Sequence, residues 1–185
     1  MDCGAQQYQR YLTGEDEALV ELIRDHKDGL ILFLNRYVDN IFTAEELAED
    51  TFFRLVTRRP GFTAKYSFKT WLYTIGRNLA MDHLKKVGRC RELSPEDLAR
   101  MHSEADDLER AHFRQERKIS LHRAMSALRK EYSGVLYLKF FEELTNEEIA
   151  KIMEKNKRQV ENLLYQAKRA LKSQLEQEGF DDEEL

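Results

Sequence analysis

The stretch Leu144–Lys172, LTNEEIAKIMEKNKRQVENLLYQAKRALK, decides how the chain folds, because it predicts two helices with a tight break between them. Thr145 is placed to cap the first helix, and Glu148, three residues later, is placed to bond back to it, as in a capping box. The same spacing recurs at Asn156 and Gln159, where a second helix is expected to begin. The stretch therefore predicts a pair of capped helices.

The second of these helices has one apolar and one polar face. Its apolar residues recur at intervals of three and four, at Val160, Leu163, Leu164, Ala167 and Leu171. Long hydrogen-bonding side chains occupy the other face and suit phosphates and base edges in a DNA major groove; they are Lys157, Arg158, Asn162, Tyr165, Gln166 and Arg169. We interpret the pair as a helix-turn-helix, although an ordinary helical hairpin with a solvated basic face would have the same pattern.

The composition is that of a helical globular chain without a membrane segment. Of its 185 residues, 35% are charged and 42% hydrophobic, and only two are proline. No apolar run approaches the roughly 20 residues of a membrane span, and the N-terminus lacks the pattern of a secretory signal. Cys3 and Cys90 have no metal-ligand spacing. We therefore expect a cytoplasmic protein without membrane insertion.

Charge is distributed unevenly behind the net value of −4. Residues 65–91 contain seven basic residues and one acidic, and residues 155–172 contain six and one. By contrast, residues 92–116 contain eight acidic and three basic residues, and residues 176–185 contain six acidic and none basic. Two basic patches separated by acidic segments suit a chain that touches DNA at two places, although solvated helix faces also segregate charge.

The N-terminal half predicts a helix over residues 15–38, after a frayed or short lead-in over residues 1–13. A second capping box, at Thr43, predicts a helix that ends near Arg58, before a Pro-Gly pair. Phe53 lies among carboxylates on the outer face of this helix, which indicates either a partner surface or a second layer of core.

Residues 62–86 interleave aromatic and basic side chains across an expected loop, over residues 62–66, and a following helix. Such a mixture suits single-stranded or melted nucleic acid, whose unpaired bases stack on aromatic rings. Helical periodicity by itself favours a core position for Trp71 and Tyr73.

The expected fold class is all-α, with two small helical domains joined by a flexible linker. Residues 1–88 would form the first domain, residues 89–115 the linker, residues 116–175 the helix-turn-helix domain, and residues 176–185 an acidic tail. The apolar run after Ser133-Gly134, through Phe140-Phe141, predicts a strongly buried helix on which the helix-turn-helix stacks.

Three blocks of this sequence together resemble the bacterial RNA polymerase sigma factors, specifically the short two-domain extracytoplasmic-function group. AEELAEDTFFRLV looks like the family's core-polymerase-binding helix, and FKTWLYTIGRNLAMDHLKK looks like the segment that melts and reads the promoter −10 element. The stretch 144–172 looks like the helix-turn-helix that reads the −35 element. The similarity spans about residues 15–175, with the linker unmatched.

This resemblance implies three sets of binding residues, with core RNA polymerase, promoter DNA and an anti-sigma factor as partners. It implies no catalytic residue, metal or cofactor. Core polymerase would be bound by Glu46, Glu49, Asp50, Phe53 and Arg54. The −10 element would be bound by Phe62, Lys65, Tyr66, Lys69, Trp71, Arg77, Asn78, Lys85, Lys86 and Arg89. The −35 element would be bound by Lys157, Arg158, Gln159, Glu161, Asn162, Tyr165, Gln166 and Arg169.

The sequence departs from the family pattern at several positions. Gly76 stands where a small alanine is usual, and Glu154 replaces the frequent glycine of the helix-turn-helix turn. Lys155 replaces an apolar residue, and Glu161 and Gln166 occupy positions that are often basic. The recognition helix is therefore less cationic than is typical of the group.

Two other function classes remain open from the residues themselves. A polymerase-independent helix-turn-helix repressor or activator would bind palindromic half-sites as a dimer, but that function leaves residues 68–86 unexplained. A metal-dependent nuclease or phosphohydrolase is disfavoured, because the five histidines are scattered and no HExxH, glycine-rich phosphate loop or nucleophile elbow occurs.

Overall fold

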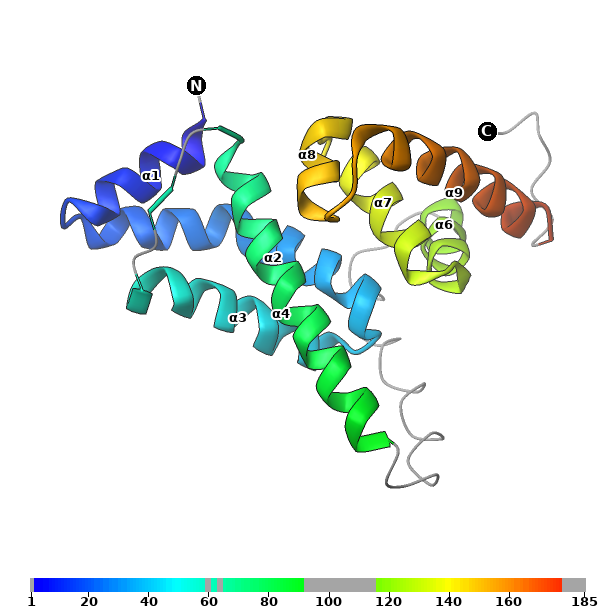
Figure 1. Cartoon of the computed structure of the whole chain (residues 1–185), viewed down its shortest axis with the longest axis horizontal. Coiled ribbons are helices and arrows are strands. Elements are labelled where there is room, and N and C mark those ends of the chain that lie inside the picture. Colours follow the sequence, from blue (N-terminus) through cyan, green and yellow to red (C-terminus); the bar gives the residue numbers. More distant parts are fainter. Residues whose placement is uncertain (1, 59–60, 63–64, 92–115, 178–185) are drawn as a thin grey trace.

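The computed structural model describes residues 2–58, 61–62, 65–91 and 116–177, and within these ranges the regular structure is entirely α-helical. The all-α prediction is thus confirmed for the described residues, whereas most of the expected linker and acidic tail lies outside them. Figure 1 shows α1–α4 gathered as one group beside a second group, α6–α9. The helices are α1 Cys3–Leu12, α2 Asp16–Val38, α3 Ile41–Arg58, α4 Phe68–Arg91, α6 Glu116–Ala127, α7 Lys130–Phe140, α8 Asn146–Ile152 and α9 Lys157–Gln177.

Helix α2 is the centre of the first group, because α1, α3 and α4 all pack against it. Its apolar stripe includes Leu22, Leu30 and Leu34, which are fully buried. Leu72 of α4 and Leu55 of α3 are buried against the same core. The helical periodicity of the sequence therefore identifies the inner faces of these three helices.

Helix α1 contradicts the expectation of a frayed lead-in over residues 1–13. The Asp2 carboxylate accepts hydrogen bonds from the backbone N–H of Ala5, which caps α1, and from that of Phe68, at the start of α4. Tyr8 is 1% exposed, and its ring contacts those of Phe68 and Trp71. The N-terminal segment therefore fixes the beginning of α4.

The start of α3 also differs from the prediction, because α3 begins at Ile41 rather than after Thr43. Asp39 ends α2 in the left-handed conformation, with φ of 56°. Asn40 follows directly, and its side-chain oxygen accepts a hydrogen bond from the Thr43 N–H at 3.0 Å. The Asn40 side chain therefore takes the capping position that the sequence pattern assigned to Thr43. Although Val56 is apolar, its side chain on α3 is exposed.

The second group contains the helix-turn-helix, and both predicted helix starts are confirmed. The capping box between Thr145 and Glu148 is complete at the start of α8. Asn156 and Gln159 exchange two hydrogen bonds of 2.8 Å at the start of α9. Glu154 lies between the helices with φ of 55°, in the conformation that favours glycine.

Helix α7 is only partly as predicted. Val135 and Leu138 are buried as expected, but Phe140 and Phe141 at its end are exposed. Ser133-Gly134 does not precede the helix but lies inside it. Phe141 stacks in parallel on Tyr137 with ring centroids 5.2 Å apart, so its ring covers a core residue instead of entering the core.

The two groups of helices share one continuous hydrophobic core. Helix α7 packs against α2, and α8 packs against α4. The buried cluster runs without interruption from Tyr8 in α1 to Ala167 in α9. Tyr137 of α7 is buried in this shared region, where its hydroxyl donates to the Gly29 carbonyl of α2 at 3.2 Å. The two predicted domains are therefore packed together along α2 and α4.

Because of His26, the protein is expected to lose stability in mild acid. Burial lowers the pKa of His26 from 6.5, and the nearby Lys69 ammonium acts in the same direction against weaker opposing carboxylates. A group with a lowered folded pKa contributes stability above its unfolded pKa and loses it as pH falls. The free energy of unfolding should therefore decrease from about pH 7 to pH 5, and His26→Gln should show less of this decrease. Urea unfolding at a series of pH values measures both; parallel profiles for the two proteins would contradict the assignment.

Candidate nucleic-acid and polymerase interface

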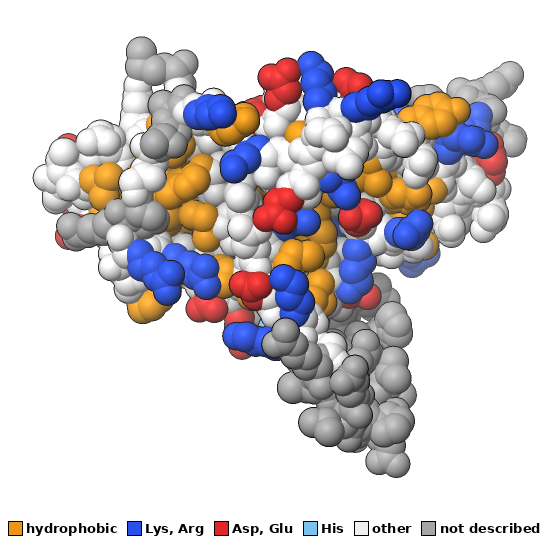
Figure 2. Space-filling view, viewed as in Figure 1, with side chains coloured by type: hydrophobic (Ala, Val, Ile, Leu, Met, Phe, Trp, Pro, Cys, Tyr) orange, Lys and Arg blue, Asp and Glu red, His pale blue; other side chains and the backbone are white. Residues whose placement is uncertain are grey.

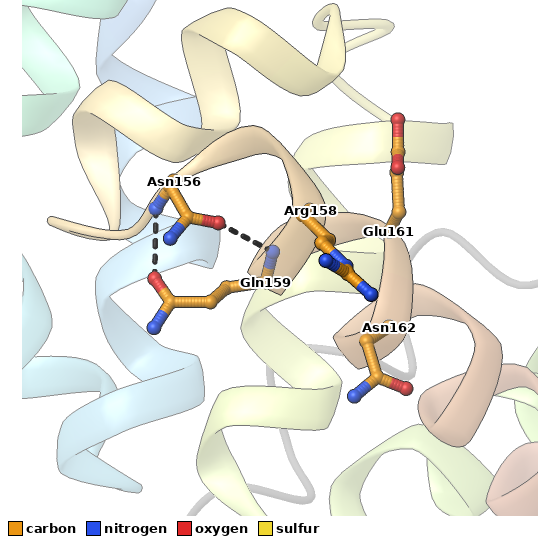
Figure 3. Close-up of a pocket in the computed structure, with 5 residues that line it drawn as sticks. All are labelled: Asn156, Arg158, Gln159, Glu161 and Asn162. Atoms are coloured by element: carbon orange, nitrogen blue, oxygen red, sulfur yellow. Dashed lines mark hydrogen bonds between the residues drawn. The ribbon is translucent and has the colours of Figure 1, made fainter.

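The exposed face of α9 begins at a capped, open hollow of about 540 Å³. Figure 3 shows Asn156 and Gln159 joined by their two hydrogen bonds, with Arg158 and Asn162 projecting from the next part of the helix. Glu161 also lines the hollow. The reciprocal cap fixes the first turn of α9, where a helix that enters a major groove presents its base-contacting side chains.

The eight side chains predicted to contact the −35 element are all exposed, which brings them together on the solvent side of α9. Tyr165 is 61% exposed, and the Arg169 guanidinium lies 5.8 Å from its ring centroid. Gln166 accepts a hydrogen bond from the Tyr132 hydroxyl, and Lys157 pairs with Glu147 at 3.0 Å. Val160, Leu164 and Ala167 are buried on the opposite side, so the predicted division of faces is confirmed.

The aromatic residues expected to capture the −10 strand form a partly buried cluster at the start of α4. Phe62 lies against Phe68 and Trp71, with ring centroids 5.8 and 5.5 Å apart. Trp71 is half-buried, and Tyr73 is 1% exposed, as periodicity predicts. Lys65 lies over the ring of Tyr66. Phe62, Tyr66 and Trp71 are each only partly buried, so part of each side chain reaches solvent.

The basic residues predicted to hold the −10 strand divide into two classes. Asn78, Lys85 and Lys86 are exposed, the two lysines beside a hollow between α3 and α4. Lys69 and Arg77 instead contact the second group of helices, and the Arg77 side chain is only 12% exposed. The side chain of Arg89 lies outside the described residues. The structure therefore does not bring the ten predicted −10 residues onto one open surface.

The outer face of α3 carries the predicted polymerase-binding side chains. Glu46, Glu49 and Asp50 are exposed, Arg54 is half-buried, and Phe53 is 64% exposed. Phe42 is also exposed, in the first turn of α3, and we did not single it out from the sequence. Its spacing of seven from Glu49 and eleven from Phe53 was the available signal, because it places the three on one helix face.

Comparison with known proteins supplies the deciding observation. A family model described as "Sigma-70 region 2" matches residues 22–90, and one described as "Sigma-70, region 4" matches residues 118–171. The chain belongs to the sigma-70 family, in its extracytoplasmic-function group. It is a sigma factor, which directs promoter-specific transcription initiation by RNA polymerase.

Curated relatives match this sigma factor over nearly its whole length. RNA polymerase sigma factor SigV of Bacillus subtilis is 28% identical, over 88% of this chain and 93% of the relative. ECF RNA polymerase sigma factor SigW of the same organism is 27% identical, over 88% and 91%. The described helices α2–α4 lie almost wholly within the region 2 match, and α6–α9 lie largely within the region 4 match.

Two solved structures share the fold of this sigma factor. The sigma factor RpoE in complex with the anti-sigma factor NepR, from Bartonella quintana, is 19% identical with a TM-score of 0.64, covering 84% of this chain and 95% of that one. CnrH in complex with the cytosolic domain of CnrY is 18% identical with a TM-score of 0.62, covering 94% and 95%. At these identities the likeness concerns the fold.

Two kinds of feature are absent from the part of the chain that the structure describes. No helix in the described ranges is long and apolar enough to cross a membrane. Among the same residues, no group of three histidine, cysteine or acidic side chains is arranged to hold a metal ion.

Proposed function

We propose that this sigma factor contacts the transcription machinery through three surfaces, which lie on α3, α4 and α9. The outer face of α3 binds core RNA polymerase, the residues 62–66 loop with α4 captures the melted −10 strand, and α9 reads the −35 element. In domain terms, residues 1–88 act as region 2, residues 89–115 as linker, residues 116–175 as region 4, and residues 176–185 as an acidic tail. The chain acts in the cytoplasm and catalyses no reaction itself.

The observation that carries this proposal is the geometry of α9. All eight predicted −35 contacts are exposed, and the helix presents them from a first turn fixed by the Asn156–Gln159 cap. Arg158 and Asn162 are one turn apart at the edge of the hollow. Arginine pairs with guanine and asparagine with adenine through two hydrogen bonds each in the major groove, so these two residues are the proposed base readers.

At the −10 element, the proposed roles follow from side-chain chemistry. Phe62, Tyr66 and Trp71 offer aromatic rings on which flipped bases stack. Lys69, Arg77, Asn78, Lys85, Lys86 and Arg89 hold strand phosphates, which makes DNA binding fall steeply as salt concentration rises. The polymerase carries out the chemistry on the nucleotide substrates, and this chain determines where on the DNA, and at which sequence, it acts.

An anti-sigma factor is a further proposed partner of this chain. Of the two proteins that share its fold, RpoE was solved with the anti-sigma factor NepR bound, and CnrH with the cytosolic domain of CnrY bound. An apolar hollow of about 480 Å³ lies between α6, α7 and α9, lined by Leu121, Phe140 and Leu171 among others. That hollow and the exposed Phe53 are candidate contact points for a regulator that competes with polymerase.

Run-off transcription on a genomic fragment library tests the proposed function directly. With core polymerase present, the purified chain should produce specific starts that vanish when it is omitted. Sequencing those starts reveals the −10 and −35 elements. Absence of specific starts, or sequence-specific DNA binding without polymerase, would favour the polymerase-independent regulator instead.

Phe53→Ala should weaken binding to core polymerase by about tenfold or more, since a buried aromatic anchor at an interface contributes about 2 kcal/mol or more. The 64% exposure of Phe53 in the free protein indicates that the substitution leaves the fold intact. Competition with a labelled reference sigma factor for core polymerase measures the change. Val20→Ala, on an exposed apolar residue of α2, is the matched control and should bind normally; equal affinity of the Phe53 variant would remove this residue from the interface.

A further inference from the structure

Three glutamates of the helix-turn-helix domain contact the face of α4 that is proposed to bind the promoter strand. Glu142 pairs with Lys69 at 2.8 Å, and Glu154 pairs with Arg77 at 3.5 Å. Figure 2 shows acidic and basic side chains lying next to one another across the middle of the molecule, where α8 packs against α4. Two of the proposed phosphate-binding cations are therefore already paired with carboxylates.

Glu148 makes a third contact, at the N-terminus of α4. Its carboxylate accepts hydrogen bonds from the hydroxyls of Ser67 at 2.7 Å and Thr70 at 3.0 Å. The same carboxylate closes the capping box of α8 with Thr145. Burial raises its pKa, but the four hydrogen bonds from Ser67, Thr145 and Thr70 outweigh burial and lower the pKa overall, so Glu148 is ionised at neutral pH. One side chain thus both starts α8 and attaches it to α4.

Two glycines, one in α7 and one in α2, let the two groups of helices approach closely enough for the carboxylates to reach α4. A Cβ on Gly134 of α7 would lie 2.7 Å from the hydroxyl and 3.1 Å from the ring of Tyr37, which is buried in α2. A Cβ on Gly29 of α2 would meet the Glu142 carboxylate and the Tyr73 hydroxyl. The Glu142 side chain is only 9% exposed, so it occupies a closed site rather than a solvated surface.

We propose that Glu142, Glu148 and Glu154 act as an internal substitute for the −10 strand, holding region 4 against α4 so that free sigma factor cannot bind single-stranded DNA. The proposal rests on the proposed role of α4. Each carboxylate provides the anionic oxygens that a phosphate would provide, to an ammonium, a guanidinium or a hydroxyl pair. DNA and region 4 therefore exclude each other from α4, and binding requires the domains to separate.

The surface on α9 is not covered in this closed arrangement, because all eight of its predicted contacts are exposed. The inhibition is therefore one-sided: the free chain should retain weak binding to duplex DNA while its affinity for single strands is suppressed. The suppression comes from three glutamates that lie in and beside α8, within the same domain as α9.

Two variants of the full chain test the closed arrangement in different ways. Gly134→Ala forces α7 away from Tyr37 without changing charge, and alanine favours the helix that contains it. Glu142→Gln removes the charge that pairs with Lys69. Their controls are Gly88→Ala, whose Cβ would meet open space, and Glu143→Gln, on an exposed neighbouring carboxylate. Circular dichroism verifies that helix content is retained.

Two readouts are measured on each variant. Fluorescence anisotropy gives the affinity for labelled oligo-dT of about 20 nucleotides, a probe for sequence-independent strand binding. Energy transfer between dyes at Val20→Cys and Ser173→Cys, with Cys3 and Cys90 changed to serine, reports the separation of α2 from α9. Both test variants should increase this separation and bind oligo-dT about tenfold more tightly than the unmodified chain, because apparent affinity scales with the open fraction. The controls should change neither readout.

Three results would contradict the proposal. Separation without a gain in affinity would overturn the proposal, because α4 would then be open and still not bind DNA. A gain in affinity without separation would also overturn it, because charge removal at one site would suffice. An unchanged separation in both variants would show that the glycine contact and the Glu142 pair do not hold the domains. Run-off transcription with the unmodified chain reports on the proposed function separately from all three results.

Discussion

Replacing Arg158 and Asn162 together with alanine should lower transcription from a −35-dependent promoter by on the order of 100-fold or more, since each two-bond base contact contributes about 1–3 kcal/mol. Both residues are exposed at the first turns of α9 and line the same hollow. Run-off transcription with saturating core polymerase measures the loss. Affinity for core polymerase should not change, because the α3 surface lies in the other group of helices.

Arg123→Ala is the matched control for this double variant, because it removes an exposed positive charge from α6, away from the predicted recognition face. Its transcription should stay within about fivefold of the unmodified chain, since exposed single charges contribute about 1 kcal/mol or less. Equal losses in the control and in the Arg158/Asn162 variant would mean that α9 contributes general charge only, and base recognition would have to be sought elsewhere in the domain.

Tyr8→Ala should lower the free energy of unfolding by about 3–5 kcal/mol, the usual cost of removing a large aromatic side chain from a core. Tyr8 is 1% exposed and contacts the rings of Tyr11, Phe68 and Trp71. The cavity would open at the start of α4, so strand binding should suffer together with stability. Equilibrium unfolding in urea measures the change in free energy.

Tyr165→Ala removes the same ring from an exposed position and serves as the stability control. Its free energy of unfolding should stay within about 0.5 kcal/mol of the unmodified chain, as is usual for surface substitutions. A Tyr8 variant as stable as the Tyr165 variant would show that α1 is an accessory to the fold rather than a part of its core.

The features that the sequence predicted well are those with local causes. The caps at Thr145 and Asn156 depend on residues three positions apart, and both are formed as predicted. Helix α1 was missed because its stability comes from distant partners. Asp2 bonds to a backbone group 66 positions away, and Tyr8 packs on rings from α4. Such contacts leave no periodic signal in a stretch of ten residues.

The same distinction between local and distant causes applies to the residues of the candidate site. Exposure of Phe53, Arg158 and Asn162 follows from helical spacing, which determines the outward faces of α3 and α9. Pairing of Lys69 with Glu142 and of Arg77 with Glu154 joins residues more than seventy positions apart. No spacing rule connects those positions, and whether the two ion pairs form depends on how α7 and α8 pack against α2 and α4.

The continuous core has a consequence for how the free chain unfolds. Because Tyr137 and Tyr37 lie where α2 and α7 pack together, losing either group of helices exposes apolar surface on the other. Groups of helices that share one hydrophobic core unfold together in one cooperative step. A single melting transition is therefore expected for the isolated sigma factor, and its separated halves should each melt at a lower temperature than the whole.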